Sequence, residues 1–160
     1  MPKKPHAPPE EFPPDRKDHT PGGAAFTNFV VELFRLNGKM IAAGDKLTRD
    51  LGMTSARWQV LGAIGREAKT VADAARVMGL TRQNVQRIAD WLVESGMAEF
   101  IDNPNHRRAK LVTLTPKGVA LRQRINRRQA KWANDIAAHL TLEEVEAAID
   151  LLKRVGRRLG

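Results

Sequence analysis

Residues 71–115 constrain the fold of this chain more than any other stretch. Their pattern predicts a helix, a tight turn, a second helix and then a two-stranded hairpin. Gly79 allows the first helix to end and the chain to reverse. The hydroxyl of Thr81 can accept a hydrogen bond from a first-turn amide of the second helix. This order of elements predicts a helix-turn-helix followed by a β-hairpin.

The second of these helices is predicted to be amphipathic. Val85, Ile88 and Leu92 recur at helical spacing, so they form one apolar stripe. Gly96 then provides the C-terminal stop. A helix that buries this stripe presents polar side chains outward, and Arg and Gln can pair with guanine and adenine edges in a major groove. These outward residues are Arg82, Gln83, Gln86, Arg87 and Asp90.

The hairpin is predicted from two short β-compatible runs, residues 98–101 and 110–114. The segment DNPNHRRA between them starts with residues that favour a turn. Arg107 and Arg108 fall at the tip or just past it. Adjacent cations on such a hairpin are well placed to reach a phosphate or a narrow minor groove.

The string NPNHRRAKLVTLTPKG, within this order of elements, resembles the wing and following helix start of the multiple antibiotic resistance regulator (MarR) family. In that family the wing has roughly the pattern Asp-Pro-x-Asp-Arg-Arg, and the next strand ends in Leu-Thr-x-x-Gly. The positions that match are Pro104, Arg107, Arg108, Leu114, Thr115 and Gly118. Asn103 and His106 depart from the pattern, because the family has Asp at both places. Residues 52–64, with Trp58, also resemble the family's helix before the helix-turn-helix.

The resemblance covers the chain from about Phe26 onward. It implies a mostly α-helical fold with a small β-hairpin, in which a winged helix-turn-helix is flanked by long terminal dimerisation helices. The predicted parts are a Pro-rich arm (1–23), which lies outside the resemblance, and three parts that the resemblance implies: a dimerisation helix (24–53), a winged helix-turn-helix DNA-binding domain (54–115) and C-terminal dimerisation helices (116–160).

Periodicity predicts the remaining helices. Residues 24–49 carry a broad apolar arc. One chain has too few other elements to cover so much apolar surface. The arc therefore favours an intertwined dimer over a monomer in which this segment is an ordinary core helix. Further helices are predicted over 54–68, from Thr115 to about His139, and from Thr141, where TLEE forms a capping box. A short linking strand is predicted at 69–70. In the first helix of the motif, the predicted packing residues are Val71, Ala74, Ala75, Val77 and Met78.

The first 23 residues hold seven of the nine prolines, mixed with charges of both signs. Proline removes backbone donors, and few apolar side chains are present to be buried. We therefore expect an extended or disordered arm. Its cations could touch DNA, but a solvated tail is the favoured interpretation.

Charge and composition narrow the class of protein. A net charge of +9 indicates a polyanionic partner, although a merely soluble basic protein has the same charge. The sequence has no apolar run of about 18 residues and no secretory signal pattern. Cysteine is absent, and the four histidines share no metal-ligand spacing. We expect a cytoplasmic bacterial protein without metal or other cofactor.

The predicted function is that of a sequence-specific transcription regulator, a repressor that binds a pseudo-palindromic operator as a homodimer. The predicted DNA-contacting residues are Thr81, Arg82, Gln83, Asn84, Gln86, Arg87, Asn105, His106, Arg107, Arg108 and Lys110. The resemblance also implies release by a small aromatic or anionic effector. The corresponding pocket would involve Asn37, Met40, Arg57 and Trp58.

Three other classes remain as alternatives. An architectural DNA-binding protein without sequence preference would show steep salt dependence and little discrimination. A dimer that binds a protein partner and no DNA is a second. An enzyme is the weakest, because the sequence has no phosphate-binding glycine loop, nucleophile elbow or metal cluster.

Overall fold

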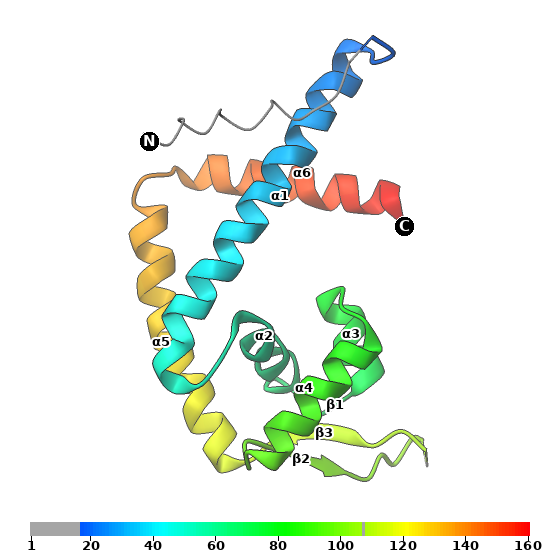
Figure 1. Cartoon of the computed structure of the whole chain (residues 1–160), viewed down its shortest axis with the longest axis vertical. Helices are drawn as coiled ribbons and strands as arrows, with labels where there is room; N and C mark the ends of the chain where they lie inside the picture. The colour runs from blue at the N-terminus through cyan, green and yellow to red at the C-terminus, as the bar shows by residue number, and fades with distance from the viewer. Residues whose placement is uncertain (1–16, 107) are drawn as a thin grey trace, which may run out of the picture. The chain divides into compact units, whose positions relative to one another are not determined.

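The computed structural model describes residues 17–106 and 108–160. The described residues up to Lys46 form one compact unit and Leu47–Gly160 form another. The helices are α1 (Pro21–Thr48), the 3-10 helix η1 (Arg49–Leu51), α2 (Ser55–Ile64), α3 (Val71–Met78), α4 (Arg82–Glu94), α5 (Pro116–Ala137) and α6 (Leu142–Leu159) (Figure 1). The strands are β1 (Lys69–Thr70), β2 (Ala98–Ile101) and β3 (Leu111–Leu114). The mostly helical fold with a small sheet confirms the predicted fold class.

The sheet has three strands, in the order β1-β3-β2. Strands β2 and β3 form the predicted antiparallel hairpin, with Ala98 opposite Leu114. Strand β1 pairs antiparallel with the other edge of β3, with Lys69 opposite Val112. The strand at 69–70 was predicted, but its place beside the hairpin was not. There the two-residue β1 covers part of an edge that would otherwise be open.

A threonine immediately precedes each helix from α2 to α6. The Thr hydroxyl accepts a hydrogen bond from the amide three residues on, at 3.1–3.3 Å. The capping residues are Thr54, Thr70, Thr81, Thr115 and Thr141. All five have extended backbone, which a β-branched residue adopts readily. At Thr141, the Glu144 carboxylate also accepts from the Thr141 amide at 2.8 Å, which confirms the predicted capping box.

Glycines in the left-handed conformation set the turns of the helix-turn-helix. Gly79 has φ 62° between α3 and α4, and Gly96 has φ 68° after α4, as predicted. Helix α2 is shorter than predicted, because it stops before Gly65, which has poor helix propensity. Helix α1 starts at Pro21, so the last three residues of the predicted arm are helical. Helix α5 ends at Ala137, two residues before the predicted end.

The hydrophobic core lies within residues 47–160. The apolar stripe of α4 is buried as predicted, with Leu92 fully inaccessible to solvent. The largest fully buried side chains are Leu61, Leu92, Ile125, Val60, Val85, Val112 and Thr48. The prediction for Val77 was wrong, since 65% of this residue is exposed. Helical geometry directs Val71, Ala74 and Ala75 into the core and Val77 away from it.

A bidentate ion pair and one further hydrogen bond tie residues 47–50 to α5. The Arg128 guanidinium donates to the two carboxylate oxygens of Asp50 at 2.5 and 2.7 Å, and also to the Leu47 carbonyl at 3.0 Å. The hydrogen bonds from Arg128 hold the pKa of Asp50 below its usual value. This fork fixes residues 47–51 against the helix that follows the hairpin.

The terminal helices expose large apolar side chains. On α1, Phe34 is 71% exposed, and on α6, Leu142 is 67% exposed. Helix α6 has no buried residue among those described. None of the described helices is long and apolar enough to cross a membrane.

Candidate nucleic-acid interface

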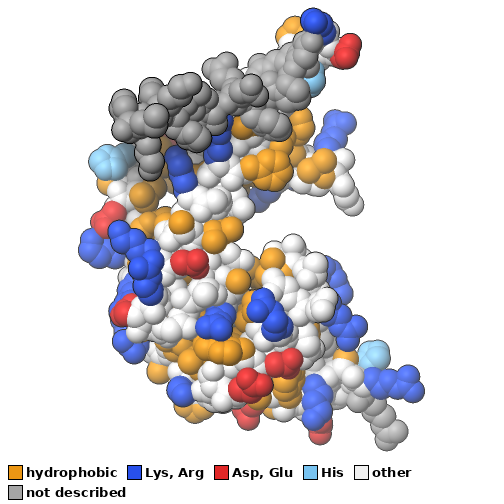
Figure 2. Space-filling model, viewed as in Figure 1, with side chains coloured by type: hydrophobic (Ala, Val, Ile, Leu, Met, Phe, Trp, Pro, Cys, Tyr) orange, Lys and Arg blue, Asp and Glu red, His pale blue; other side chains and the backbone are white. Residues whose placement is uncertain are grey.

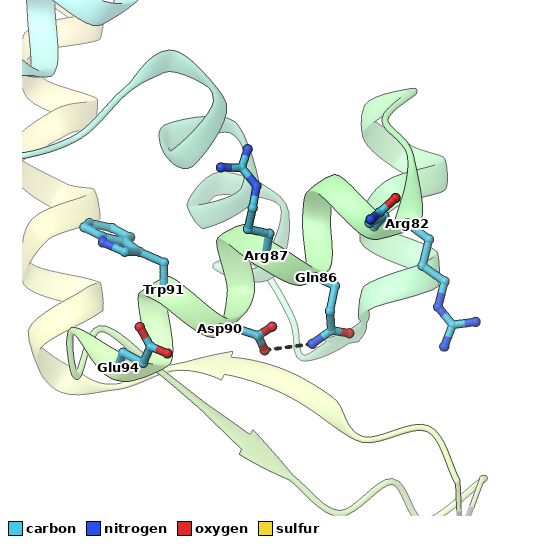
Figure 3. Close-up of a pocket in the computed structure, with 7 residues that line it drawn as sticks. Arg82, Gln86, Arg87, Asp90, Trp91 and Glu94 are labelled. Atoms are coloured by element: carbon cyan, nitrogen blue, oxygen red, sulfur yellow. Dashed lines mark hydrogen bonds between the residues drawn. The ribbon is translucent and has the colours of Figure 1, made fainter.

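Helix α4 carries five of the eleven predicted contact residues, and four of these five lie on its exposed face. Because Val85, Ile88 and Leu92 face the core, the opposite side of the helix is left to polar groups. This side borders an open hollow of about 830 Å³. Its lining residues are Arg82, Gln83, Gln86, Arg87, Asp90, Trp91 and Glu94 (Figure 3). We call this surface the recognition face.

Two hydrogen bonds join side chains along α4. Gln86 Nε2 donates to Asp90 Oδ1 at 2.8 Å, and Arg87 Nη2 donates to Asn84 Oδ1 at 3.1 Å. The Thr81 hydroxyl is engaged as the helix cap, where it accepts from the Asn84 amide at 3.3 Å. A hydroxyl that accepts one bond keeps its own hydrogen for donation, so the cap leaves Thr81 able to reach a phosphate.

A second hollow, of about 380 Å³, joins α4 to the hairpin. It brings Arg82 and Gln86 of the recognition face together with Arg108 and Lys110. The other lining residues are Thr70, Val71, Ala72, Phe100 and Ala109. Figure 2 shows Lys and Arg side chains around the hairpin end and the adjoining helix face. Three cations around one small hollow form a suitable site for a phosphate group.

The hairpin tip is built from backbone turns. Asn103 Oδ1 accepts from the Asn105 amide at 2.9 Å, and the Asn103 carbonyl accepts from the His106 amide at 3.2 Å. Asn103, which replaces the family's Asp, thus serves as a turn residue. Asn105, His106 and Arg108 are exposed there. Arg107 lies outside the described residues, so its contact stays a prediction, as do the expectations for residues 1–16.

Arg57 lies against the recognition helix. Its guanidinium carbon is 3.6 Å from the centroid of the Trp91 ring, and its Nη1 donates to the Gly52 carbonyl at 3.1 Å. Sequence reasoning assigned Arg57 to an effector pocket and missed Trp91. The sequence did contain a signal for Trp91. Trp91 is four residues after Arg87, so the two residues lie on the same side of the helix. The stacked pair places a cation at the edge of the recognition face.

Of the four predicted effector-pocket residues, Trp58 lines a cavity. This cavity has a volume of about 490 Å³ and is bordered by α2, α3 and α5. It is lined by Trp58, Gln59, Gly62, Ala63, Arg66, Glu67, Lys69, Val77, Met78, Arg122 and Asn126. Arg122 Nε is buried there and has no hydrogen-bond partner among the described residues. Asn37 and Met40 are exposed on α1, within the other unit.

The described residues contain no cluster of three or more His, Cys, Asp or Glu side chains suited to a metal ion.

Comparison with known proteins gives consistent matches. A family model described as the MarR family matches residues 51–109. An uncharacterized protein of Mycobacterium tuberculosis is 38% identical over 126 residues, which cover 79% of this chain and 88% of the relative. The structure of a mutant MarR from Escherichia coli, complexed with operator DNA, matches with 29% identity and a TM-score of 0.66 over 80% of this chain and 96% of that chain.

A further match shows the fold alone. CouR from Rhodococcus jostii, bound to p-coumaroyl-CoA, is 24% identical, with a TM-score of 0.70 over 77% of this chain and 87% of that chain. Members of the matched family are transcription regulators and not enzymes. With its capped helix-turn-helix, its hairpin and these matches, the chain belongs to the MarR family of DNA-binding transcription regulators.

Proposed function

We propose that the chain is a sequence-specific repressor that binds a near-palindromic operator as a homodimer. The observation that carries this proposal is the second hollow, where Arg82 and Gln86 of α4 lie with Arg108 and Lys110 of the hairpin. This arrangement offers side chains for base edges and cations for the backbone at one surface. The mutant MarR of Escherichia coli, which was solved with operator DNA, supports the same use of this fold.

In the proposed complex, α4 enters the major groove with its N-terminal half foremost. Arg82, Gln83 and Gln86 contact base edges, because their side chains can form paired hydrogen bonds. The hairpin lies against the backbone or in the minor groove. The residues proposed for phosphate or minor-groove contact are Thr81, Asn84, Arg87, Asn105, His106, Arg107, Arg108 and Lys110.

A second copy of the chain is the proposed partner of the terminal helices. Phe34 on α1 and Leu142 and Leu159 on α6 are each more than half exposed, at 71%, 67% and 79%. Burial of these side chains between two copies would remove a large apolar surface from water. The dimer would hold two α4 helices about 34 Å apart, one turn of the DNA duplex.

Binding to the DNA that flanks the chain's own gene tests this function. We expect Arg82→Ala to weaken operator binding by about 1–3 kcal/mol and to relax specificity at one position of each half-site. Lys110→Ala should weaken binding to all sequences alike and flatten the log–log salt slope by about one unit for each phosphate that is no longer neutralised. Both are measured by fluorescence anisotropy with random duplex as competitor.

Lys153→Ala is the matched control, because it removes the same charge from α6. It should leave the operator affinity unchanged. Equal affinity of the unmodified protein for operator and random duplex would instead favour the architectural class. Failure to bind any duplex at low salt would favour a partner-binding module, and a strictly monomeric chain would contradict the dimer.

The proposed effector is a small aromatic anion, and its proposed site is the cavity beside Trp58. The indole can stack on an aromatic ring, and Arg66, Lys69 and Arg122 surround the cavity with positive charge. Glu67 also lines it, but lies in an ion pair with Lys69. The Arg122 Nε–H, buried and without a partner among the described residues, would gain an acceptor from a carboxylate. Bound effector would favour a spacing of the two α4 helices that no longer fits the operator.

Titration with salicylate and related phenolic acids tests this site through Trp fluorescence and operator release. We expect Arg122→Gln to weaken effector binding about tenfold or more, because it removes a charged hydrogen bond. Phenol, which has the ring but no carboxylate, is the matched control and should release little DNA. If Arg122→Gln binds every acid and releases operator DNA as the unmodified protein does, this cavity is not the effector site.

A further inference from the structure

The side-chain amide of Gln86 is held in one orientation by a neighbour on its own helix. Gln86 Nε2 donates to Asp90 Oδ1 at 2.8 Å, and the two residues are four apart, so both lie on the recognition face (Figure 3). An ionised carboxylate can only accept hydrogen bonds. A flipped amide would place its own oxygen against the carboxylate oxygen, so the flipped form is disfavoured.

This hydrogen bond determines which atoms of Gln86 remain for DNA. One N–H of the amide is used by Asp90, which leaves Oε1 and the second N–H. An acceptor and a donor side by side form the pattern that pairs with N6 and N7 of adenine in the major groove. Gln86 lies on the recognition face and also lines the second hollow, between α4 and the hairpin. Its free amide atoms therefore lie where a base edge would approach.

Asp90 is otherwise an unfavourable residue at this place. An exposed carboxylate on a helix that faces DNA is repelled by the phosphates, which lowers affinity for every sequence. The nearby guanidinium of Arg87 donates to Asn84 at 3.1 Å. The hydrogen bond of the Asp90 carboxylate goes to Gln86, so orientation of that amide is the interaction that can offset the repulsion.

We propose that Asp90 is a positioning residue that makes Gln86 specific for adenine at one position in each operator half-site. It lowers total affinity and raises discrimination between sequences. This inference rests on the proposed function, because it requires α4 to lie in the major groove.

The test compares Asp90→Asn with the unmodified protein on a panel of operators in which each base pair is replaced in turn. Asparagine has the same shape but can donate as well as accept, so the Gln86 amide can adopt either orientation. We expect the preference for adenine to fall about tenfold at one position and its symmetry mate. Preferences elsewhere in the site should not change.

Glu94→Gln is the matched control. It removes the same charge from the recognition face, one turn further along α4. We expect it to raise affinity for all duplexes and to leave discrimination unchanged at every position. Gln86→Ala should lose the preference at the same position as Asp90→Asn, and the two changes together should lose no more than one alone.

Two results would overturn the inference. One is an Asp90→Asn variant that behaves like Glu94→Gln, with higher affinity for all sequences and full discrimination. The other is a Gln86→Ala variant that keeps the preference at every position. Failure of the proposed function is distinguishable, since the unmodified protein would then show no preference for its operator.

Discussion

Gly118→Ala is expected to lower the free energy of unfolding by about 3 kcal/mol or more, because it overpacks a rigid junction. A Cβ atom at Gly118 would lie 1.9 Å from the Met97 carbonyl oxygen and 3.0 Å from its carbon. The same oxygen accepts a hydrogen bond from the Thr115 amide at 3.1 Å. Since the obstacle is backbone, the start of α5 must move away from Met97, the residue before β2, and no side-chain rotation relieves the overlap.

Urea unfolding followed by circular dichroism measures this effect, with both proteins at one concentration because dimerisation adds to stability. Gly62→Ala in α2 is the control, since a Cβ there would meet nothing within 4 Å. It should raise stability by about 0.5–1 kcal/mol. Equal midpoints for the two variants would contradict the close approach at Gly118.

Leu92→Ala is expected to cost about 2–5 kcal/mol, because it leaves a cavity in the core. Leu92 is fully buried on the inner side of α4, in the same stripe as the buried Val85 and Ile88. The cavity would weaken the attachment of the recognition helix to the rest of the domain. Thermal and urea unfolding should both report it.

Val77→Ala is the control for Leu92→Ala. Because Val77 is 65% exposed, we expect a change within about 0.5 kcal/mol. A cost as large as that of Leu92→Ala would mean that Val77 packs in the core, as its sequence position first indicated.

The parts of the fold that were predicted correctly depend on local signals. Gly79, Thr81 and Gly96 act on the residues next to them, and the stripe of α4 is a periodic pattern within one helix. The strand at 69–70 was predicted without its partner, because the pairing of Lys69 with Val112 joins distant parts of the chain. Val77 was misplaced because a helix of eight residues offers more than one apolar direction, and its neighbours in space decide which is buried.

In the candidate site, too, the features that follow from local sequence patterns could be predicted, and a contact between two helices could not. That Arg82 and Gln83 would be exposed followed from the buried stripe, although their contacts with DNA stay a prediction. The pair of Gln86 and Asp90 has the i, i+4 spacing at which helix side chains meet, so the sequence contained that signal. The stacking of Arg57 on Trp91 joins two helices, and no pattern along the chain specifies it.

Substitutions at the capping threonines could change the melting temperature of the protein. The hydroxyls of Thr54 and Thr141 accept from amides of two different helices, so the effects of changing these two residues should add. Thr115 is more constrained, because its hydroxyl also donates to the Gly96 carbonyl at 2.7 Å. A cap is worth about 1 kcal/mol, or about 2–4 °C in melting temperature for a domain of this size. Descendants of this gene can therefore shift their melting point in small steps while the side chains that face an operator stay the same.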